Sequence, residues 1–180
     1  MNIFVLNEDP EKAARDMCNK HIVKMLIEST QIMCTVFRLS MEDRWSLSAK
    51  NINLYPRLYK ATHINHPAVK WVNSSVHNTD WMWQHLLATE NEYNFRYNKS
   101  YEKQYKVWPV IRELEQVRWN IWKNFGDWRQ HTSFVQCMPD QYKTQDAVAA
   151  YRAFYHGEKA KFAKWKPHAD EPIWWQNKSA

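Results

Sequence analysis

The segment from Lys20 to Phe37 constrains the fold most strongly, because it is a long apolar stretch with helical spacing. Its sequence, KHIVKMLIESTQIMCTVF, is apolar enough for a core helix. Burying an imidazole, an ammonium group and a carboxylate there is costly unless they are paired or used for chemistry. The side chains that share one helical face, at intervals of three and four residues, are Met17, His21, Lys24, Glu28, Gln31 and Thr35. This row, the polar stripe, is the leading candidate for a functional site.

The rest of the chain also favours helices over strands. It contains only two glycines, Gly126 and Gly157, with no Asn-Gly hairpin signal and no strongly alternating segment. A chain of 180 residues is long enough to bury one hydrophobic core. We therefore expect an all-α fold, a compact single helical domain over residues 1–180 with about four main helices and long loops.

The first two helices have clear start signals. Asp9-Pro10 combines a capping side chain with proline at the first helical position, and the helix should run to about Leu39. Residues 40–66 have no clear period, and we expect a long loop with one short helix near residues 46–55. A second helix should start at His66-Pro67 and run to about Tyr97.

The second half of the chain is expected to hold two further helical regions. Ser100 is a candidate cap for the third, which Pro109 interrupts and Gly126 ends. A loop should follow over residues 127–143. The fourth helix should run from about Thr144 to Trp165.

The aromatic and basic content is compatible with two kinds of partner. Eleven Trp, nine Tyr and seven Phe are too many for the core alone, and the net charge is +6. Aromatic faces beside basic side chains can stack on unpaired bases, but surplus Trp and Tyr are equally typical of protein-binding surfaces. The basic residues are dispersed, and those after the second helix favour a solvated face: Arg96, Lys99, Lys103 and Lys106.

Several classes of protein can be set aside. Cys18, Cys34 and Cys137 are an odd number without close pairing, which favours free thiols in a reducing cytoplasm. No secretory signal or membrane-spanning run is present, so we expect a cytoplasmic protein that does not contact a membrane. Two glycines exclude P-loop and dinucleotide motifs, and no zinc-protease or serine-hydrolase motif occurs. We expect no cofactor.

The sequence THINHP holds His63 and His66 at a spacing that two metal ligands could share. Such a pair needs further ligands, for which the following helix offers His77, His85 and Asp80. The alternative is that His66 caps that helix while His63 lies in the preceding loop. Contacts of the pair with phosphate or a base are more plausible than ligation, so we expect no metal site.

One face of the second helix mixes aromatic and polar side chains. Trp71, Asn78, Trp81 and His85 share this face. Helix packing explains an aromatic ridge more often than ligand stacking does, although a dry interface would not favour Asn78. We therefore keep these four residues, with His63 and His66, as candidates for nucleic-acid binding.

The polar stripe resembles part of a known enzyme family, the phage-type pyrimidine-dimer DNA glycosylases with abasic-site lyase activity, of the endonuclease V type. That family has a polar residue and a histidine in its first long helix, with a catalytic glutamate seven positions after the histidine. Asn19, Lys20, His21 and Glu28 match this arrangement. Asn65-His66-Pro67 is similar to an element of more distant relatives. The whole chain also resembles uncharacterised small proteins of tailed phages.

The resemblance implies an all-α DNA repair enzyme and a role for each matching residue. Glu28 would stabilise a cationic sugar intermediate and move the protons of β-elimination. The nucleophile would be the α-amine of Asn2 after methionine removal or, as a substitute, a desolvated Lys24. His21 would orient Glu28 or contact phosphate. Trp71 or Trp81 would stack on an extruded base.

Two features of the chain depart from that family, and other functions stay open. Asn2 is a poor context for methionine removal, and Ile27 stands where the family has arginine before the glutamate. One alternative is a non-catalytic nucleic-acid-binding module in which the polar stripe is structural. Another is a phage accessory protein that binds and inhibits a host protein through its aromatic residues.

Overall fold

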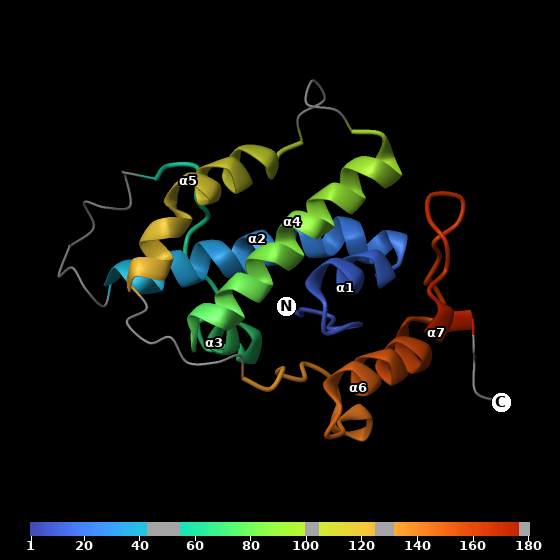
Figure 1. The fold of residues 1–180 in the computed structure, drawn as a ribbon. Helices are drawn as coiled ribbons and strands as arrows, with labels where there is room; N and C mark the ends of the chain where they lie inside the picture. The colour runs from blue at the N-terminus through green and yellow to red at the C-terminus, as the bar shows by residue number, and fades with distance from the viewer. Residues whose placement is uncertain (43–54, 100–104, 125–131, 177–180) are drawn as a thin grey trace.

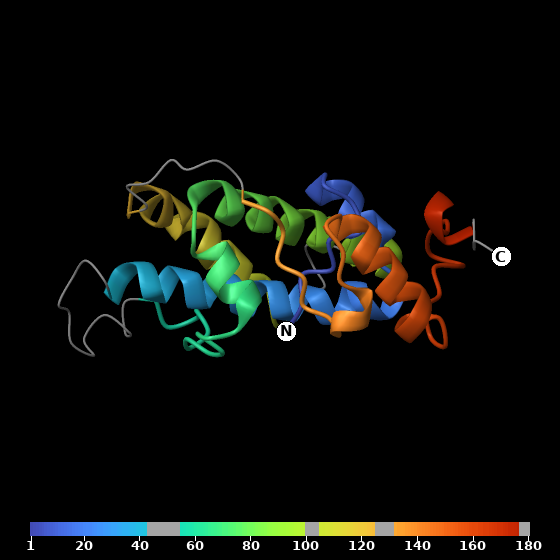
Figure 2. The same ribbon diagram turned by 90° about the horizontal axis from the view of Figure 1, so that it is seen from below.

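The protein is all-α, as predicted. The computed structural model describes residues 1–42, 55–99, 105–124 and 132–176, and these form helices without a β-strand. The α-helices are α1 (Pro10–Asp16), α2 (Asn19–Glu42), α3 (Pro67–Val72), α4 (Val76–Tyr97), α5 (Trp108–Asn124), α6 (Ala147–Phe154) and α7 (Ile173–Gln176). Helices α2 and α4 cross in the middle of Figure 1, where the chain's N-terminus is drawn between α1, α3 and α6; Figure 2 shows that the N-terminus lies to one side of α2. None of the described helices is long and apolar enough to cross a membrane.

The first predicted helix is two helices. It starts as expected, because the Asp9 carboxylate accepts hydrogen bonds from the backbone of Glu11 at 2.9 Å and of Lys12 at 3.1 Å. The expectation of one continuous helix to Leu39 is wrong, since Met17 has extended backbone angles and separates α1 from α2. The local sequence holds neither glycine nor proline at this break, so its cause is tertiary.

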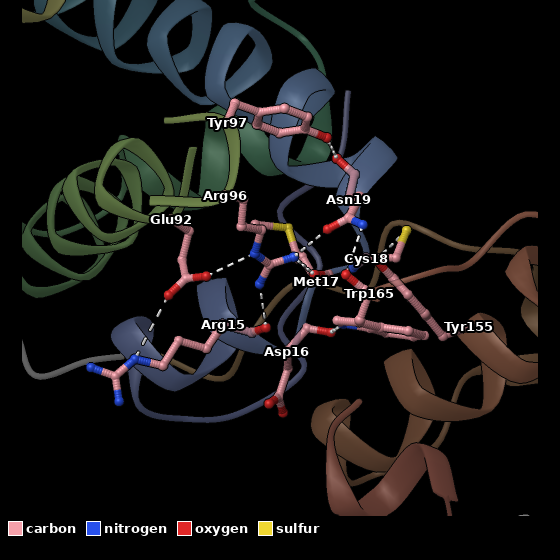
Figure 3. Close-up of polar contacts among 10 residues, drawn as sticks. All are labelled: Arg15, Asp16, Met17, Cys18, Asn19, Glu92, Arg96, Tyr97, Tyr155 and Trp165. Atoms are coloured by element: carbon pink, nitrogen blue, oxygen red, sulfur yellow. Dashed lines mark hydrogen bonds and ion pairs between the residues drawn. The ribbon is translucent and has the colours of Figure 1, made fainter. Parts of the chain in front are cut away.

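Arg96 supplies that tertiary contact (Figure 3). Its guanidinium donates hydrogen bonds to the backbone oxygens of Arg15 and Met17 at 2.8 and 2.7 Å, and to the Asn19 side chain at 3.2 Å. It also pairs with Glu92 at 2.8 Å. Carbonyls left without helical partners at the break are thereby satisfied. Arg96 is only 3% exposed, so the expectation that it lies on a solvated face is wrong.

The second predicted helix is also divided. His66 caps α3 as one interpretation of the sequence proposed, because its Nδ1 accepts the Ala68 N–H at 3.1 Å. The chain then turns, and Ser75 caps α4 by accepting the Asn78 N–H at 3.1 Å. Helix α4 ends near Tyr97 as expected, where Asn98 takes a left-handed conformation with φ of 47°.

The later helices are shorter than expected. Helix α5 begins at Trp108, and Pro109 occupies its first turn instead of interrupting a helix. The fourth predicted helix, Thr144 to Trp165, comprises only α6 and a π-helical turn, η3 (Tyr155–Lys159). Within η3, a Cβ atom on Gly157 would collide with the ring of Tyr142. Any larger residue at position 157 would therefore require the Tyr142 side chain to move.

Three sequence expectations fall outside the described residues. These are the caps and stops at Ser100 and Gly126, and the short helix near residues 46–55 except for its last residue. The segment over residues 132–146 is an irregular chain with one 3₁₀ turn, η2 (Asp140–Tyr142), which agrees with the loop expected there. Cys18, Cys34 and Cys137 are free thiols.

The C-terminal tail is tied to the junction between α1 and α2. The indole N–H of Trp165 donates to the Asp16 backbone oxygen at 3.1 Å, and that of Trp174 donates to the Asp16 carboxylate at 2.7 Å. The Asn19 side chain donates to the Trp165 backbone oxygen at 2.9 Å. Residues from both ends of the chain therefore pack against the start of α2, which carries the polar stripe.

Candidate active site

Glu28 lies at the centre of the candidate site, on the second half of the polar stripe. One carboxylate oxygen, Oε2, accepts the backbone N–H of Asn2 at 3.2 Å. The other, Oε1, lies 3.3 Å from the Lys24 ammonium nitrogen. The side chain of Glu28 is 16% exposed and that of Lys24 is 56% exposed, so the pair lies at the surface with its carboxylate partly shielded. Three of the four residues that the sequence predicts as catalytic therefore meet here: Asn2, Lys24 and Glu28.

Hydrogen bonds of its side chain and burial of the following residues hold Asn2 in this position. The Asn2 side-chain amide donates to the Cys137 backbone oxygen at 2.8 Å. Its side-chain oxygen accepts the backbone N–H groups of Ile3 at 2.7 Å and Phe4 at 3.0 Å. The next four residues, Ile3 to Leu6, are almost wholly buried in the core. The chain before Ile3 is therefore fixed against α2 by packing and by hydrogen bonds.

Of the two histidines of THINHP, His66 lies within electrostatic reach of this centre. The backbone of Thr62 exchanges hydrogen bonds with the Thr35 hydroxyl, at 3.2 and 3.3 Å, which fixes the loop to the end of the polar stripe. Burial lowers the pKa of His66, the charges of the amino terminus and of His63 lower it further, and Glu28 opposes them. His66 is therefore close enough to sense both the amino terminus and Glu28. His63 is exposed, with a left-handed φ of 51°.

His21, the fourth residue predicted as catalytic, lies in the core. It is 4% exposed, stacks on Phe4 at 4.3 Å between ring centroids, and shares a short hydrogen bond from Nδ1 with the Tyr155 hydroxyl. Burial, aided by the charges of Lys24 and Lys159, lowers its pKa to about 3. The imidazole is thus neutral near pH 7. The expected contact of His21 with phosphate does not fit this burial, because η3 covers the ring.

The aromatic and polar residues of α3 and α4 are also buried. Trp71 and Trp81 are each 7% exposed, and Asn78 and His85 are not exposed at all. The Asn78 side chain donates to the Trp71 backbone oxygen at 2.9 Å and to Thr132 at 2.8 Å. These four residues form the α3–α4 face, which the segment after residue 131 covers. Their expected role in stacking on an extruded base does not fit this placement.

Two members of the α3–α4 face have further features. Trp81 borders a cavity of about 720 Å³, which is lined by Glu8, Trp81, Thr132, Ser133, Phe134, Gln136, Gln145, Asp146, Ala147 and Val148. His85 stacks on Trp81 at 5.0 Å, and neither of its ring nitrogens has a hydrogen-bond partner in the described structure. Burial lowers the pKa of His85 to about 4, so the ring is neutral.

The histidines do not gather with other ligand types. Within the described ranges, no three His, Cys, Asp or Glu side chains converge in a way that could hold a metal ion. His85 is buried under Trp81, while His63 lies exposed in its loop and His77 is exposed on α4. The possible ligand set of the THINHP histidines is therefore not assembled.

Sequence reasoning missed the residues that complete the site from the C-terminal half. Cys137 contributes a backbone oxygen to Asn2, and Tyr155 contributes a hydroxyl to His21. A backbone oxygen carries no sequence signal. Tyr155 falls within the fourth predicted helix, and its position there carries no sign of a contact with His21. The available signal was His21 itself, a polar residue on an apolar helix. A buried imidazole needs a hydrogen-bond partner, which here is the Tyr155 hydroxyl.

Comparisons with known proteins identify a family but no individual relative. No curated protein and no solved structure matches the chain significantly. The family match covers α1 to α4 and therefore includes Asn2, Lys24, Glu28 and His66. The model of the pyrimidine dimer DNA glycosylase family matches residues 1–105, more than half of the chain, and the chain therefore belongs to this family.

Proposed function

We propose that the protein is a DNA glycosylase with abasic-site lyase activity that acts on damaged or modified DNA. One observation carries this proposal. The Glu28 carboxylate contacts two nitrogens, the Asn2 backbone nitrogen at 3.2 Å and the Lys24 ammonium at 3.3 Å. An amine beside a shielded carboxylate is the pairing that nucleophilic attack on a sugar carbon requires.

The first chemical step transfers the sugar from its base to an amine of the protein. The amine nitrogen attacks C1′ of the damaged nucleotide and forms a C–N bond. The glycosidic bond breaks and the base departs with the bonding electrons. The attacking nitrogen loses one proton to Glu28, and the departing base takes up one proton from water. Glu28 stabilises the positive charge that develops on the sugar, because its carboxylate already lies against the attacking nitrogen.

The second step cleaves the DNA strand. The nitrogen lone pair forms a C1′=N bond while the C1′–O4′ bond breaks and O4′ takes a proton from Glu28, which gives an open-chain iminium ion, a Schiff base with the amine. Glu28 then removes a proton from C2′, and the C3′–O bond breaks with departure of the 3′-phosphate. Hydrolysis of the iminium ion returns the amine. The proton transfers of this step therefore use the Glu28 carboxylate, which contacts both Asn2 and Lys24.

Two amines are candidates for the nucleophile. The Asn2 nitrogen, which lies 3.2 Å from a Glu28 carboxylate oxygen in the intact chain, becomes a primary amine when the peptide bond to Met1 is cut. Lys24 carries a primary amine at 3.3 Å from the same carboxylate, but its side chain is 56% exposed to water. The rigid anchoring of Asn2 by Cys137 favours the N-terminal amine.

The histidines near this centre have two different roles in the proposal. His63 is exposed and His66 is partly exposed, which supports contacts of both with the DNA phosphates that flank the nucleotide. His21 is a positioning residue. It stacks on Phe4, two residues from Asn2, and so holds the N-terminal segment against α2.

Borohydride trapping tests the proposal directly. The protein is incubated with duplex DNA that carries one abasic site or, separately, ultraviolet lesions, and sodium borohydride is added. A covalent adduct that maps by mass spectrometry to the first residues or to Lys24 supports the lyase and names its nucleophile. The Glu28→Gln variant should give no adduct, while Glu115→Gln, on α5, should trap like the parent. The absence of both adduct and strand cleavage for the parent protein overturns the proposal.

A further inference from the structure

A group of lysines surrounds the first turns of α2. Lys20 and Lys24 lie on the exposed side of that helix, and the chain after η3 passes beside them. The backbone N–H of Asn19 donates to the Lys164 backbone oxygen at 2.9 Å, which fixes this segment against α2. We call the group the lysine patch: Lys20, Lys24, Lys159, Lys161 and Lys164.

Aromatic rings hold two of these lysines in place. The Lys159 ammonium lies 4.4 Å from the centre of the Phe154 ring, and the Lys20 ammonium lies 5.4 Å from that of Phe162. A cation over a ring face is stabilised without being neutralised, because the ring carries no net charge. Neither ring pairs off the ammonium group that it contacts, so both lysines remain available to an external anionic partner.

The patch has little internal charge compensation. Within the described part of the chain, only Lys24 of the five forms an ion pair, with Glu28. Burial lowers the pKa of Lys159; Glu158 opposes this, and the positive charges of Lys24 and Lys161 lower it further. Lysines close enough to repel one another raise the energy of the free protein, which a polyanion bound across them relieves.

We infer that the lysine patch binds the phosphate backbone of the DNA duplex and guides it to Glu28. The inference rests on the proposed function, which makes DNA the substrate. Lys24 belongs both to the patch and to the contact with Glu28, so a strand held by the patch leads directly to the candidate catalytic centre. The π-helical turn η3 and the residues after it, which lie outside the family match, would thus supply part of the DNA-binding surface.

The salt dependence of binding tests this inference. The ligand is a fluorescent duplex with one tetrahydrofuran abasic analogue, which cannot form a Schiff base, and anisotropy is measured from low to moderate salt. Each phosphate contact contributes about 0.9 to the slope of log K against log salt concentration. The double variant Lys159→Gln/Lys161→Gln should therefore lower the magnitude of the slope by about 2.

Two further variants serve as controls. Lys159→Arg/Lys161→Arg keeps the charge and should keep the parental slope. Lys12→Gln/Lys106→Gln removes two exposed lysines from other elements and should also leave the slope unchanged. Circular dichroism at the assay temperature confirms that each variant is folded.

Three results would overturn the inference. One is an unchanged slope in Lys159→Gln/Lys161→Gln, and another is an equal fall in the Lys12→Gln/Lys106→Gln control. The third is a Lys159→Gln/Lys161→Gln variant that binds DNA like the parent but no longer binds polyglutamate. That result would mean that the patch binds an acidic protein instead of DNA. Because the duplex cannot react, failure of the patch and failure of the lyase chemistry are separate results. A protein that cleaves abasic DNA with an unchanged slope would keep the proposed function and lose this inference alone.

Discussion

The polar stripe of α2 and the α3–α4 face have similar sequence patterns but opposite environments. Each places histidine, amide and other polar side chains on an otherwise apolar helix. On α2, Lys24 remains 56% exposed and Glu28 keeps a partly open carboxylate. On α4, Asn78 and His85 are completely buried. The same pattern therefore gives a surface centre in one region and an internal network in the other.

The covering segment explains the difference. Residues 132–134 lie over the α3–α4 face, where Asn78 bonds Thr132 and the Trp71 indole donates to the Ser133 backbone oxygen at 2.9 Å. On α2, η3 covers only the first part of the stripe, at His21. A polar group on an apolar helix thus signals that a partner is required, and the rest of the fold decides whether the partner is internal or external.

The largest effect that separates the two regions should be on catalysis. Glu28→Gln should lower the rate of abasic-site cleavage about a thousandfold, because the proton transfers lose their carboxylate. The free energy of unfolding should change by less than about 0.5 kcal/mol, since the ion pair with the exposed Lys24 contributes little. Single-turnover kinetics and urea unfolding measure the two quantities. A large decrease in the free energy of unfolding with an unchanged cleavage rate would show that Glu28, like Asn78, has a structural role.

The buried amide of the α3–α4 face should show the reverse behaviour. Asn78→Ala removes hydrogen bonds to Trp71, Ser74 and Thr132, and leaves the Thr132 N–H without its partner at 3.1 Å. We expect a loss of about 3 kcal/mol in the free energy of unfolding, with the cleavage rate of the folded protein retained. Asn91→Ala, at an exposed position of the same helix, should be nearly neutral. Equal unfolding midpoints for the two variants would contradict the assigned network.

The two buried histidines should make the protein sensitive to acid. The pKa of His21 is lowered from 6.5 to about 3 by burial, so the unfolded chain binds a proton between these values that the folded protein does not. The stabilisation is complete above about pH 6.5 and is lost as the pH falls towards 3, by a few kcal/mol. His85, with a pKa of about 4, acts in the same direction.

Urea unfolding at pH 7, 5.5 and 4.5 measures this loss. His21→Gln should be less stable than the parent at pH 7, because it loses the contacts with Phe4 and Tyr155, but should lose less on acidification. The control variant His77→Gln, at an exposed position of α4, should retain the full dependence. A parental dependence in His21→Gln would show that its imidazole does not contribute.

The smallest expected effect distinguishes the candidate nucleophiles. Lys24→Gln should change the free energy of unfolding by less than about 0.5 kcal/mol, because it breaks one ion pair between residues four apart whose lysine is exposed. If the N-terminal amine is the nucleophile, borohydride still traps an adduct in this variant. Loss of the adduct with retained duplex affinity would make Lys24 the nucleophile.

Local sequence signals predicted the fold class and several helix ends. Asp9-Pro10 and His66-Pro67 place a capping side chain before proline, and both start helices where expected. The break at Met17 was not predictable from the local sequence, because it depends on Arg96, a residue 79 positions away. The end of the helix at η3 was missed for a similar reason. The Trp165 indole donates a hydrogen bond to the Asp16 backbone oxygen, near the other end of the chain. This contact holds Trp165 away from a continuation of the helix.

The site was predicted where it depends on neighbours along one helix. Lys24 and Glu28 are four residues apart, so their ion pair follows from helical geometry alone. The separate roles of His21 and Glu28 did not follow, because both lie on the same stripe. Only the position of Tyr155, contributed from 134 residues away, assigns the histidine to the interior and leaves the carboxylate open.

The hydrogen bond between Asn2 and Cys137 has a consequence for biosynthesis. It joins residues 135 positions apart, and the bond between Asn19 and Trp165 spans 146. A ribosome releases the first of each pair long before the second, at about 5–20 residues per second. The hydrogen bond from Asn2 to Cys137 can therefore form only several seconds after Asn2 has left the ribosome. The candidate site is therefore completed late in synthesis rather than at its start.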